Sequence, residues 1–127
     1  VNIASMAAMR ANRGLSLYGM TKGAVANLTF NAATEYAKHN IRVNAISAGP
    51  VRTLAGAGVA DARQMYNYQK RNAPLRRTVS LEEIGGAGLY LLSDLGSGVT
   101  GEVHFVDSGY STISMPRMDE PTATNPD

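Results

Sequence analysis

The longest periodic run of hydrophobic positions lies between residues 17 and 38. Its apolar side chains recur every three or four residues, at Ala24, Val25, Leu28, Ala32 and Tyr36. This spacing places them on one face of a helix, so we predict a long helix over residues 17–38. Ser16 stands where a side-chain cap is expected at the start of the helix, and Asn40 is a suitable residue to end it.

Three shorter segments have the hydrophobic patterns of β-strands. Residues 1–5 (VNIAS) are typical of the end of a buried strand, and residues 42–48 (RVNAISA) of a short strand in a parallel sheet. A Gly-Pro pair at residues 49–50 ends the second strand. Residues 101–107 are the last predicted strand, in which Val103 and Phe105 alternate with His104 and so indicate two unlike faces.

Two further helices are predicted between the second and third strands. Residues 54–62 are small and we expect them to be flexible, whereas residues 61–71 can form a helix with Met65 and Tyr68 on one side. Ser80, followed three residues later by Glu83, has the pattern of a capping box, so another helix should run from there to about Leu92. The segment 116–127 holds three prolines without periodicity, and we expect it to be disordered.

The predicted order is therefore strand, helix, strand, one or two helices, and strand. This order is typical of one half of a doubly wound α/β domain with a parallel sheet, a Rossmann-like fold. We interpret residues 1–115 as the C-terminal part of a single such domain, because no segment has the context of a glycine-rich phosphate loop. Ligands of such sheets bind beyond the carboxyl ends of the strands, where we expect Ser5, residues 49–53 and Asp107.

Composition narrows the classes of function. The 127 residues, of which 44% are hydrophobic, suffice for one globular domain. A net charge of +2 gives no strongly basic surface for nucleic acid, and no apolar run approaches the length of a membrane span. The sequence has no cysteine, which excludes disulfides and cysteine metal sites and fits the reducing cytoplasm. We therefore expect a cytoplasmic protein with no metal site, no nucleic-acid partner and no membrane partner.

Tyr18 and Lys22 are the strongest candidates for chemistry. They are four residues apart, so a helix places both side chains on one face. An ammonium beside a phenol favours the phenolate, and such a tyrosine can exchange a proton with a substrate oxygen near neutral pH. Ser5, thirteen residues before the tyrosine, could hold that oxygen through its hydroxyl. The same pair also occurs by chance on ordinary helices, so its meaning depends on the surrounding segments.

Those segments resemble the C-terminal half of a short-chain dehydrogenase/reductase. A strand ends at Ser5, a loop rich in Arg, Asn and Gly follows over residues 10–14, and a helix then carries Tyr18 and Lys22. The resemblance implies that this serine, tyrosine and lysine are catalytic. It also implies that Lys22 bonds the ribose of a nicotinamide cofactor. The other cofactor contacts implied by the resemblance are Gly49, Pro50, Val51 and Thr53.

Residues 42–115 resemble a narrower group, the bacterial enoyl-acyl-carrier-protein reductases. The matching blocks are 42–55 (RVNAISAGPVRTLA), 73–79 (APLRRTV), 93–95 (SDL), 99–103 (VTGEV) and 106–110 (VDSGY). Residues 1–40 instead resemble the wider family, which includes 3-oxoacyl-acyl-carrier-protein reductases. The enoyl reductases place their tyrosine seven residues before the lysine, where this chain has Leu15, and a second tyrosine about where Ser5 stands.

The resemblance implies an oxidoreductase of fatty-acid synthesis that uses NADH, with NADPH as the alternative cofactor. Its implied substrate is an enoyl thioester on acyl carrier protein, and a 3-oxoacyl thioester is the alternative. A second alternative is an inactive fragment that cannot bind cofactor alone. Members of the family usually form tetramers, so we expect a homo-oligomer. Met65, Tyr66 and Tyr68 either line an acyl pocket or serve only in packing.

Overall fold

The computed structural model describes residues 1–52 and 62–116. Three parallel strands, β1 (Asn2–Ile3), β2 (Ala45–Ala48) and β3 (Val103–Val106), form a sheet in the order β1-β2-β3. The register pairs Ile3 with Ile46, and Ile46 with His104. The three main helices are α1 (Ser16–Tyr36), α3 (Ala62–Asn72) and α4 (Leu81–Leu92). The predicted α/β class with a parallel, Rossmann-like sheet is therefore confirmed.

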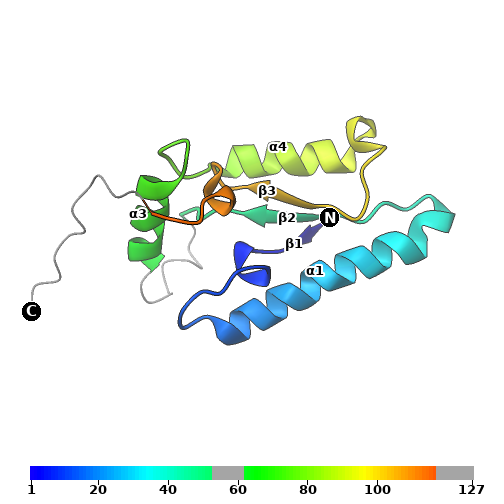
Figure 1. Cartoon of the computed structure of the whole chain (residues 1–127). Coiled ribbons are helices and arrows are strands. Elements are labelled where there is room, and N and C mark those ends of the chain that lie inside the picture. Colours follow the sequence, from blue (N-terminus) through cyan, green and yellow to red (C-terminus); the bar gives the residue numbers. More distant parts are fainter. Residues whose placement is uncertain (53–61, 117–127) are drawn as a thin grey trace, which may run out of the picture.

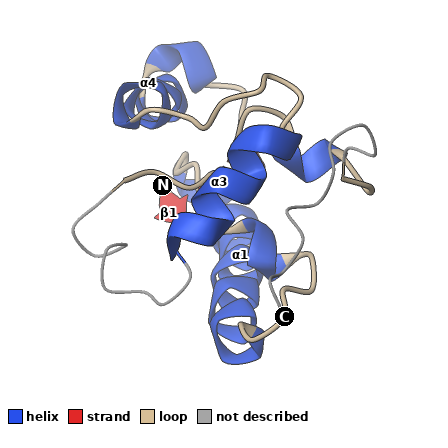
Figure 2. Cartoon of the chain, turned by 90° about the vertical axis from the view of Figure 1, so that its left-hand side faces the viewer, coloured by secondary structure: helices blue, strands red, loops and turns tan. Residues whose placement is uncertain are grey.

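The sheet lies between two helices (Figure 1). α1 lies along one side of it and α4 along the other, whereas α3 lies beyond the carboxyl ends of the strands, as the turned view also shows (Figures 1 and 2). The contacts between elements agree with this arrangement, since α1 packs on β1 while α4 packs on β2 and β3. The two helix layers thus leave the carboxyl edge of the sheet as the place where loops and α3 converge.

β2 is the centre of the core. Ala45, Ile46 and Ser47 are each at most 2% exposed, because the strand has a neighbouring strand on each edge and α4 packs on it. The strand is shorter than the predicted span of residues 42–48. Its expected first part is held by other groups, since Val43 donates its N–H to the hydroxyl of Thr100 and Asn44 bonds through its side chain. Backbone bonds also hold this part, since Gly101 N donates to the Val43 carbonyl and Asn2 N donates to the Asn44 carbonyl, each at 2.8 Å.

Helix α1 confirms the predicted long helix, but its start differs from the prediction. Ser16 is the first helical residue rather than the cap, and Leu15 occupies the cap position without a side-chain hydrogen bond. Leu15 N–H bonds to the carbonyl of Asn12, and Gly14 has a positive φ of 76°, so a backbone turn sets the start of the helix. At the other end a short 3-10 helix (Ala37–His39) continues to Asn40, whose left-handed φ of 58° confirms the predicted stop.

Helix α4 begins and ends where the sequence predicts. Ser80 Oγ accepts from Glu83 N at 3.2 Å, and Glu83 Oε2 accepts from Ser80 N at 2.8 Å, which completes the capping box. α3 also agrees with the prediction within one residue at each end. Among the described residues, no helix is both long and apolar enough to cross a membrane. The predicted flexible segment 54–62, apart from Ala62, and nearly all of the predicted disordered segment 116–127 lie outside the described residues.

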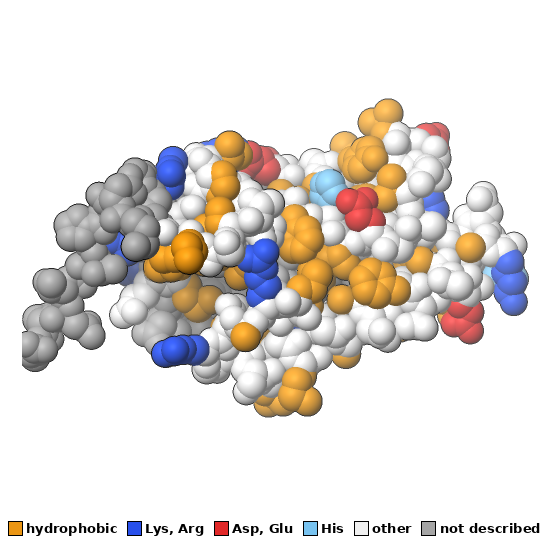
Figure 3. All heavy atoms as spheres, viewed as in Figure 1, with side chains coloured by type: hydrophobic (Ala, Val, Ile, Leu, Met, Phe, Trp, Pro, Cys, Tyr) orange, Lys and Arg blue, Asp and Glu red, His pale blue; other side chains and the backbone are white. Residues whose placement is uncertain are grey.

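Hydrophobic side chains remain on the surface of this fold. Figure 3 shows them gathered in the middle of one face, along the strands and between the two flanking helices. Several large ones are strongly exposed, among them Leu17 at 73%, Met20 at 72%, Leu89 at 70% and Leu92 at 69%. Apolar surface of this extent is typical of a face that another polypeptide segment covers.

Candidate active site

Ser5 lies two residues after the end of β1, at the carboxyl edge of the sheet. It caps a 3-10 helix (Met6–Ala8), because its Oγ accepts a hydrogen bond from Ala7 N at 3.3 Å. A serine hydroxyl has one proton and two lone pairs. The cap occupies one lone pair and leaves the hydroxyl proton of Ser5 free to be donated.

Tyr18 and Lys22 lie on one face of the first two turns of α1. The Lys22 ammonium is 5.7 Å from the centre of the Tyr18 ring, close enough for an attractive cation–π contact. The same ammonium donates to the carbonyl oxygen of Ile3 at 2.8 Å, which ties the helix to β1. Tyr18 is 44% exposed, so its phenol is accessible to a ligand.

Gly19 allows α1 to lie close to the segment that Ser5 caps. A side-chain carbon at this position would stand 3.0 Å from the carbonyl oxygen of Ala7, and one at Gly23 would stand 3.8 Å from that of Ala8. Since the 3-10 helix carries Ser5 at its start and α1 carries Tyr18 beside Gly19, close packing of the two helices brings their candidate groups to one region. The structure thus gathers the serine, tyrosine and lysine on adjoining elements.

The predicted cofactor-binding residues Gly49, Pro50 and Val51 follow the carboxyl end of β2. Gly49 N–H donates to the carbonyl of Val106 at 2.8 Å, and a side-chain carbon at Gly49 would stand only 3.0 Å from Asp107 Cα. The close approach of two strand ends therefore leaves little room for a side chain here, whatever ligand binds nearby. Val51 lines a hollow of about 230 Å³ at the start of α4. Thr53, the fourth predicted contact, lies outside the described residues.

These residues fit a nicotinamide cofactor at this edge. The ammonium of Lys22 has three N–H donors, of which Ile3 takes one, so two remain for the hydroxyls of a ribose. Backbone groups at Val51 stand at the neighbouring strand end, where cofactors of open α/β sheets bind. No group of three His, Cys, Asp or Glu side chains able to hold a metal occurs within residues 1–52 and 62–116.

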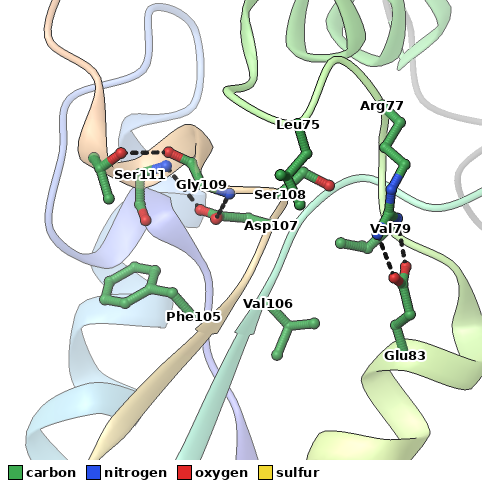
Figure 4. A pocket seen from close by; sticks show the side chains of 11 residues that line it. Leu75, Arg77, Val79, Glu83, Phe105, Val106, Asp107, Ser108, Gly109 and Ser111 are labelled. Carbon is green, nitrogen blue, oxygen red and sulfur yellow. Dashed lines mark hydrogen bonds and ion pairs between the residues drawn. The ribbon is translucent and has the colours of Figure 1, made fainter.

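Asp107 serves the backbone rather than a ligand. Its carboxylate accepts from Gly109 N at 3.0 Å and from Ser111 N at 2.8 Å, and it is 8% exposed (Figure 4). A hollow of about 330 Å³ lies beside it, between β3 and the segment that joins α3 to α4. Both carboxylate oxygens are thus used to shape the turn after β3.

The side chains proposed for an acyl pocket have defined packing partners. Tyr66 accepts a hydrogen bond from the hydroxyl of Thr78 at 2.7 Å, and the Tyr68 ring lies 6.4 Å from that of Tyr110 in an edge-to-face arrangement. Burial raises the pKa of the Tyr110 phenol, and the nearby Tyr68 adds to the rise. Met65 is 38% exposed and Tyr68 42%, so both retain surface that a ligand can contact.

One long-range contact, between Arg10 and Ile113, was not predicted from the sequence. Arg10 Nη1 donates to the carbonyl of Ile113 at 2.7 Å across a separation of 103 residues. It joins the loop after β1 to the segment after β3, next to Tyr110. No local pattern signals a bond between a loop arginine and a distant backbone oxygen, so only the folded chain reveals it.

Residues 1–111 match the profile of the family described as Enoyl-(Acyl carrier protein) reductase. The enoyl-[acyl-carrier-protein] reductase [NADH] 2 of Rhizobium meliloti (strain 1021) is 53% identical over 111 residues, which are 87% of this chain and 41% of that protein.

Solved structures are similar over the same part of the chain. FabI from Candidatus Liberibacter asiaticus has a TM-score of 0.86 and 48% identity, covering 91% of this chain and 45% of that one. An enoyl-(acyl-carrier-protein) reductase from Anaplasma phagocytophilum in complex with NAD has a TM-score of 0.85 and 43% identity, covering 91% and 44%. This chain spans less than half the length of these proteins. The predicted resemblance is confirmed, and the chain belongs to the enoyl-(acyl carrier protein) reductase family.

Proposed function

We propose that the protein carrying this chain is a nicotinamide-dependent oxidoreductase that reduces the double bond of an enoyl thioester on acyl carrier protein. The observation that carries the proposal is the 53% identity to an enoyl reductase over 87% of the chain. The grouping of Ser5, Tyr18 and Lys22 at the carboxyl edge of the sheet supports it, because ligands of such sheets bind there.

Each of the three residues has a role that its surroundings support. Tyr18 exchanges a proton with the substrate oxygen, since it is accessible and lies beside a cation. Ser5 donates a hydrogen bond to the same oxygen, because its cap with Ala7 leaves its proton free. In an enoyl thioester this oxygen becomes an enolate oxygen, and donors fixed in advance stabilise the charge that develops on it.

NADH is the cofactor in this proposal, and NADPH is its alternative. The relative from Rhizobium meliloti is named as an NADH enzyme, and the Anaplasma phagocytophilum structure contains NAD. When bound, the nicotinamide supplies the hydride. Lys22 holds the ribose with the two N–H donors that Ile3 leaves free, and Gly49, Pro50, Val51 and Thr53 line the nicotinamide end.

Reduction of a 3-oxoacyl thioester to the alcohol is the second candidate function. It is favoured by the first helix, in which the tyrosine stands four residues before Lys22 and Leu15 stands seven before it. Leu15 is the cap residue of α1 and has no acidic group, so only Tyr18 can supply the proton from this helix start. The same three residues would then protonate a ketone oxygen.

We propose a homo-oligomer, a tetramer by the resemblance, located in the cytoplasm. The exposed apolar side chains of α1 and α4 support an assembly in which another polypeptide surface covers them. Acyl carrier protein is part of the proposal because the names of the relatives include it.

The test compares crotonyl and acetoacetyl thioesters as substrates of the full-length protein that carries this sequence, with NADH and with NADPH. Faster oxidation of cofactor by the crotonyl thioester supports the enoyl reductase, and faster oxidation by the acetoacetyl thioester supports the alternative. Titration of the 127-residue chain alone with NADH, followed by cofactor fluorescence, tests the second alternative of an inactive fragment.

Tyr18→Phe in the full-length protein should lower kcat by at least about a hundredfold, because a proton donor in the transition state contributes that much or more. The Kd for NADH should change less than about twofold, since the cofactor is held by other groups. Tyr36→Phe, an exposed tyrosine at the end of the same helix, is the control and should leave both unchanged. Turnover retained by Tyr18→Phe would remove Tyr18 from the mechanism.

A further inference from the structure

One hydrogen bond in the core joins α1 to β1 away from the proposed catalytic groups. Asn2 Nδ2 donates to Thr29 Oγ1 at 3.0 Å, across a separation of 27 residues. Thr29 Oγ1 in turn donates to the carbonyl of Val25 at 2.9 Å. Thr29 is completely buried, at 0% exposure, so its hydroxyl proton and one lone pair are both satisfied inside the protein.

This bond is one of two directional links between α1 and β1 among the described residues. The other is the bond from the Lys22 ammonium to the Ile3 carbonyl, at 2.8 Å. Elsewhere the buried surface of α1 is made of small side chains, namely Ala26 and Ala33. Small side chains interlock weakly with a neighbouring strand, so apolar packing alone does not fix how far the helix lies along β1.

The two links differ in stiffness. A lysine has four flexible methylene groups between its backbone and its ammonium, and it can follow a moving acceptor. Thr29 is short and β-branched, which restricts its χ1 angle, and its hydroxyl also donates to the Val25 carbonyl one turn earlier in the helix. Of the two bonds that join α1 to β1, the Asn2–Thr29 bond is therefore the stiffer.

Because α1 is one continuous helix, the position of Thr29 along β1 also affects where Lys22 and Tyr18 lie. Lys22 and Thr29 are seven residues apart, two turns or about 10 Å along the axis, and both face the sheet. The helix runs antiparallel to β1, since Lys22 meets Ile3 while Thr29 meets the preceding residue (Figure 1). A rigid shift at Thr29 displaces Tyr18, three turns away, by the same amount.

We propose that Asn2 and Thr29 are positioning residues, whose mutual hydrogen bond holds α1 at the place along β1 where Tyr18 and Lys22 meet the substrate and cofactor. The inference rests on the proposed function for its effect on turnover. Its structural part, the control of the Lys22–Ile3 contact by Thr29, is independent of which reaction takes place.

The test uses Thr29→Val in the full-length protein, because valine keeps the shape and removes the hydroxyl. Thr34→Val is the matched control: Thr34 lies on the same helix and bonds to the carbonyl of Phe30 in its own preceding turn at 3.1 Å, but it is exposed. Thr29→Ser, which keeps the hydroxyl, is the conservative rescue.

We expect Thr29→Val to lower kcat about tenfold with the KM for the thioester changed less than twofold, since small misplacements of catalytic groups reduce rates strongly. We also expect a displaced ¹³C signal of the Ile3 carbonyl, because that carbonyl accepts the Lys22 bond. Thr34→Val should show neither change, and Thr29→Ser should restore most of the rate. In the double variant with Asn2→Ala, kcat should fall no further than in the more affected single variant, since both act through one bond.

A variant Thr29→Val that loses thermal stability but keeps kcat and the Ile3 carbonyl signal would overturn the proposal and leave Thr29 a core residue only. Equal effects of Thr29→Val and Thr34→Val would overturn it as well. The carbonyl signal is recorded without substrate or cofactor. The carbonyl signal therefore tests the positioning role without any measurement of activity. The proposed function would be rejected separately, if the wild-type protein reduced neither thioester.

Discussion

Ser108 combines two unfavourable features at one residue. Its φ of 59° is in the left-handed region, where a side chain on Cα meets the following carbonyl. It is only 6% exposed, and its hydroxyl has no hydrogen-bond partner within the described residues. The turn that needs this conformation is fixed by Asp107, whose carboxylate accepts from the backbone N–H groups of Gly109 and Ser111 (Figure 4).

Ser108→Gly should therefore raise the free energy of unfolding by about 1–2 kcal/mol, because glycine adopts a positive φ readily and leaves no buried hydroxyl unpaired. Urea unfolding of the full-length protein measures the change. Ser111→Gly is the comparison, since Ser111 lies in the same turn without a positive φ. It should be neutral or destabilising, and a loss of stability in Ser108→Gly would contradict the assigned strain.

At the scale of the element, α4 owes its start to a capping box reinforced by an ion pair. Arg77 donates to both carboxylate oxygens of Glu83, at 2.6 and 2.8 Å, while the same carboxylate accepts from Ser80 N. The hydrogen bonds from Arg77 and then from Ser80 lower the pKa of Glu83 from its ordinary 4.5 to about 2. The helix start thus depends on the ionised form of this carboxyl.

A carboxyl whose pKa falls on folding stabilises the folded state above its unfolded pKa and loses that effect as the pH falls through its folded pKa. The stabilising effect of Glu83 should thus be complete above about pH 5 and decline between pH 4.5 and 2. Glu83→Gln keeps a side chain able to accept the cap bond but removes the charge. Its melting temperature should lie below that of the wild type at pH 7, and most of this difference should be gone near pH 2.

Thermal unfolding followed by circular dichroism over this pH range measures the difference. High salt should reduce it at pH 7, because Arg77 and Glu83 are both substantially exposed and such pairs are screened. Glu35→Gln, on the exposed surface of α1, is the control and should show no such pH-dependent difference. A difference for Glu83→Gln that is as large at pH 2 as at pH 7 would show that the charge is not its cause.

At the scale of the whole molecule, Arg42 joins three parts of the fold before β2. Its guanidinium donates to the carbonyl oxygens of Leu91, Ser93 and Val99, at 2.7, 3.3 and 3.2 Å. Asn44 continues the junction by donating to the same Val99 carbonyl at 2.9 Å and accepting from Glu102 N at 3.0 Å. Together they hold the end of α4 and the loop before β3 against the central strand.

Arg42→Met should lower the free energy of unfolding by about 3 kcal/mol, because it leaves three backbone carbonyls without a charged donor while keeping an apolar stem. Arg63→Met, at an exposed position of α3, is matched in chemistry and should change stability by less than about 0.5 kcal/mol. Urea unfolding monitored at equilibrium gives both values. Similar values for the two variants would refute the role of Arg42 as a junction.

The sequence by itself determined the features that arise within a few residues. The start of α4 follows from Ser80 and Glu83, which bond across a single turn. The stop of the first long helix follows from Asn40, because few residues accept its left-handed φ. The parallel α/β class follows from the alternation of strand and helix patterns, which only a small set of topologies can satisfy.

Only the tertiary structure decided which distant groups meet. Three features have no local signal: the true ends of β2, the crowding of position 49 by Asp107, and the bond between Arg10 and Ile113. The candidate site shows the same division. Spacing in the sequence put Tyr18 and Lys22 on one helix face, but which strand residues that face meets is decided by tertiary contacts such as that of Lys22 with Ile3. The physical reason is range: caps, turns and periodicity act over a few residues of chain, whereas contacts across tens of residues exist only once the elements have packed.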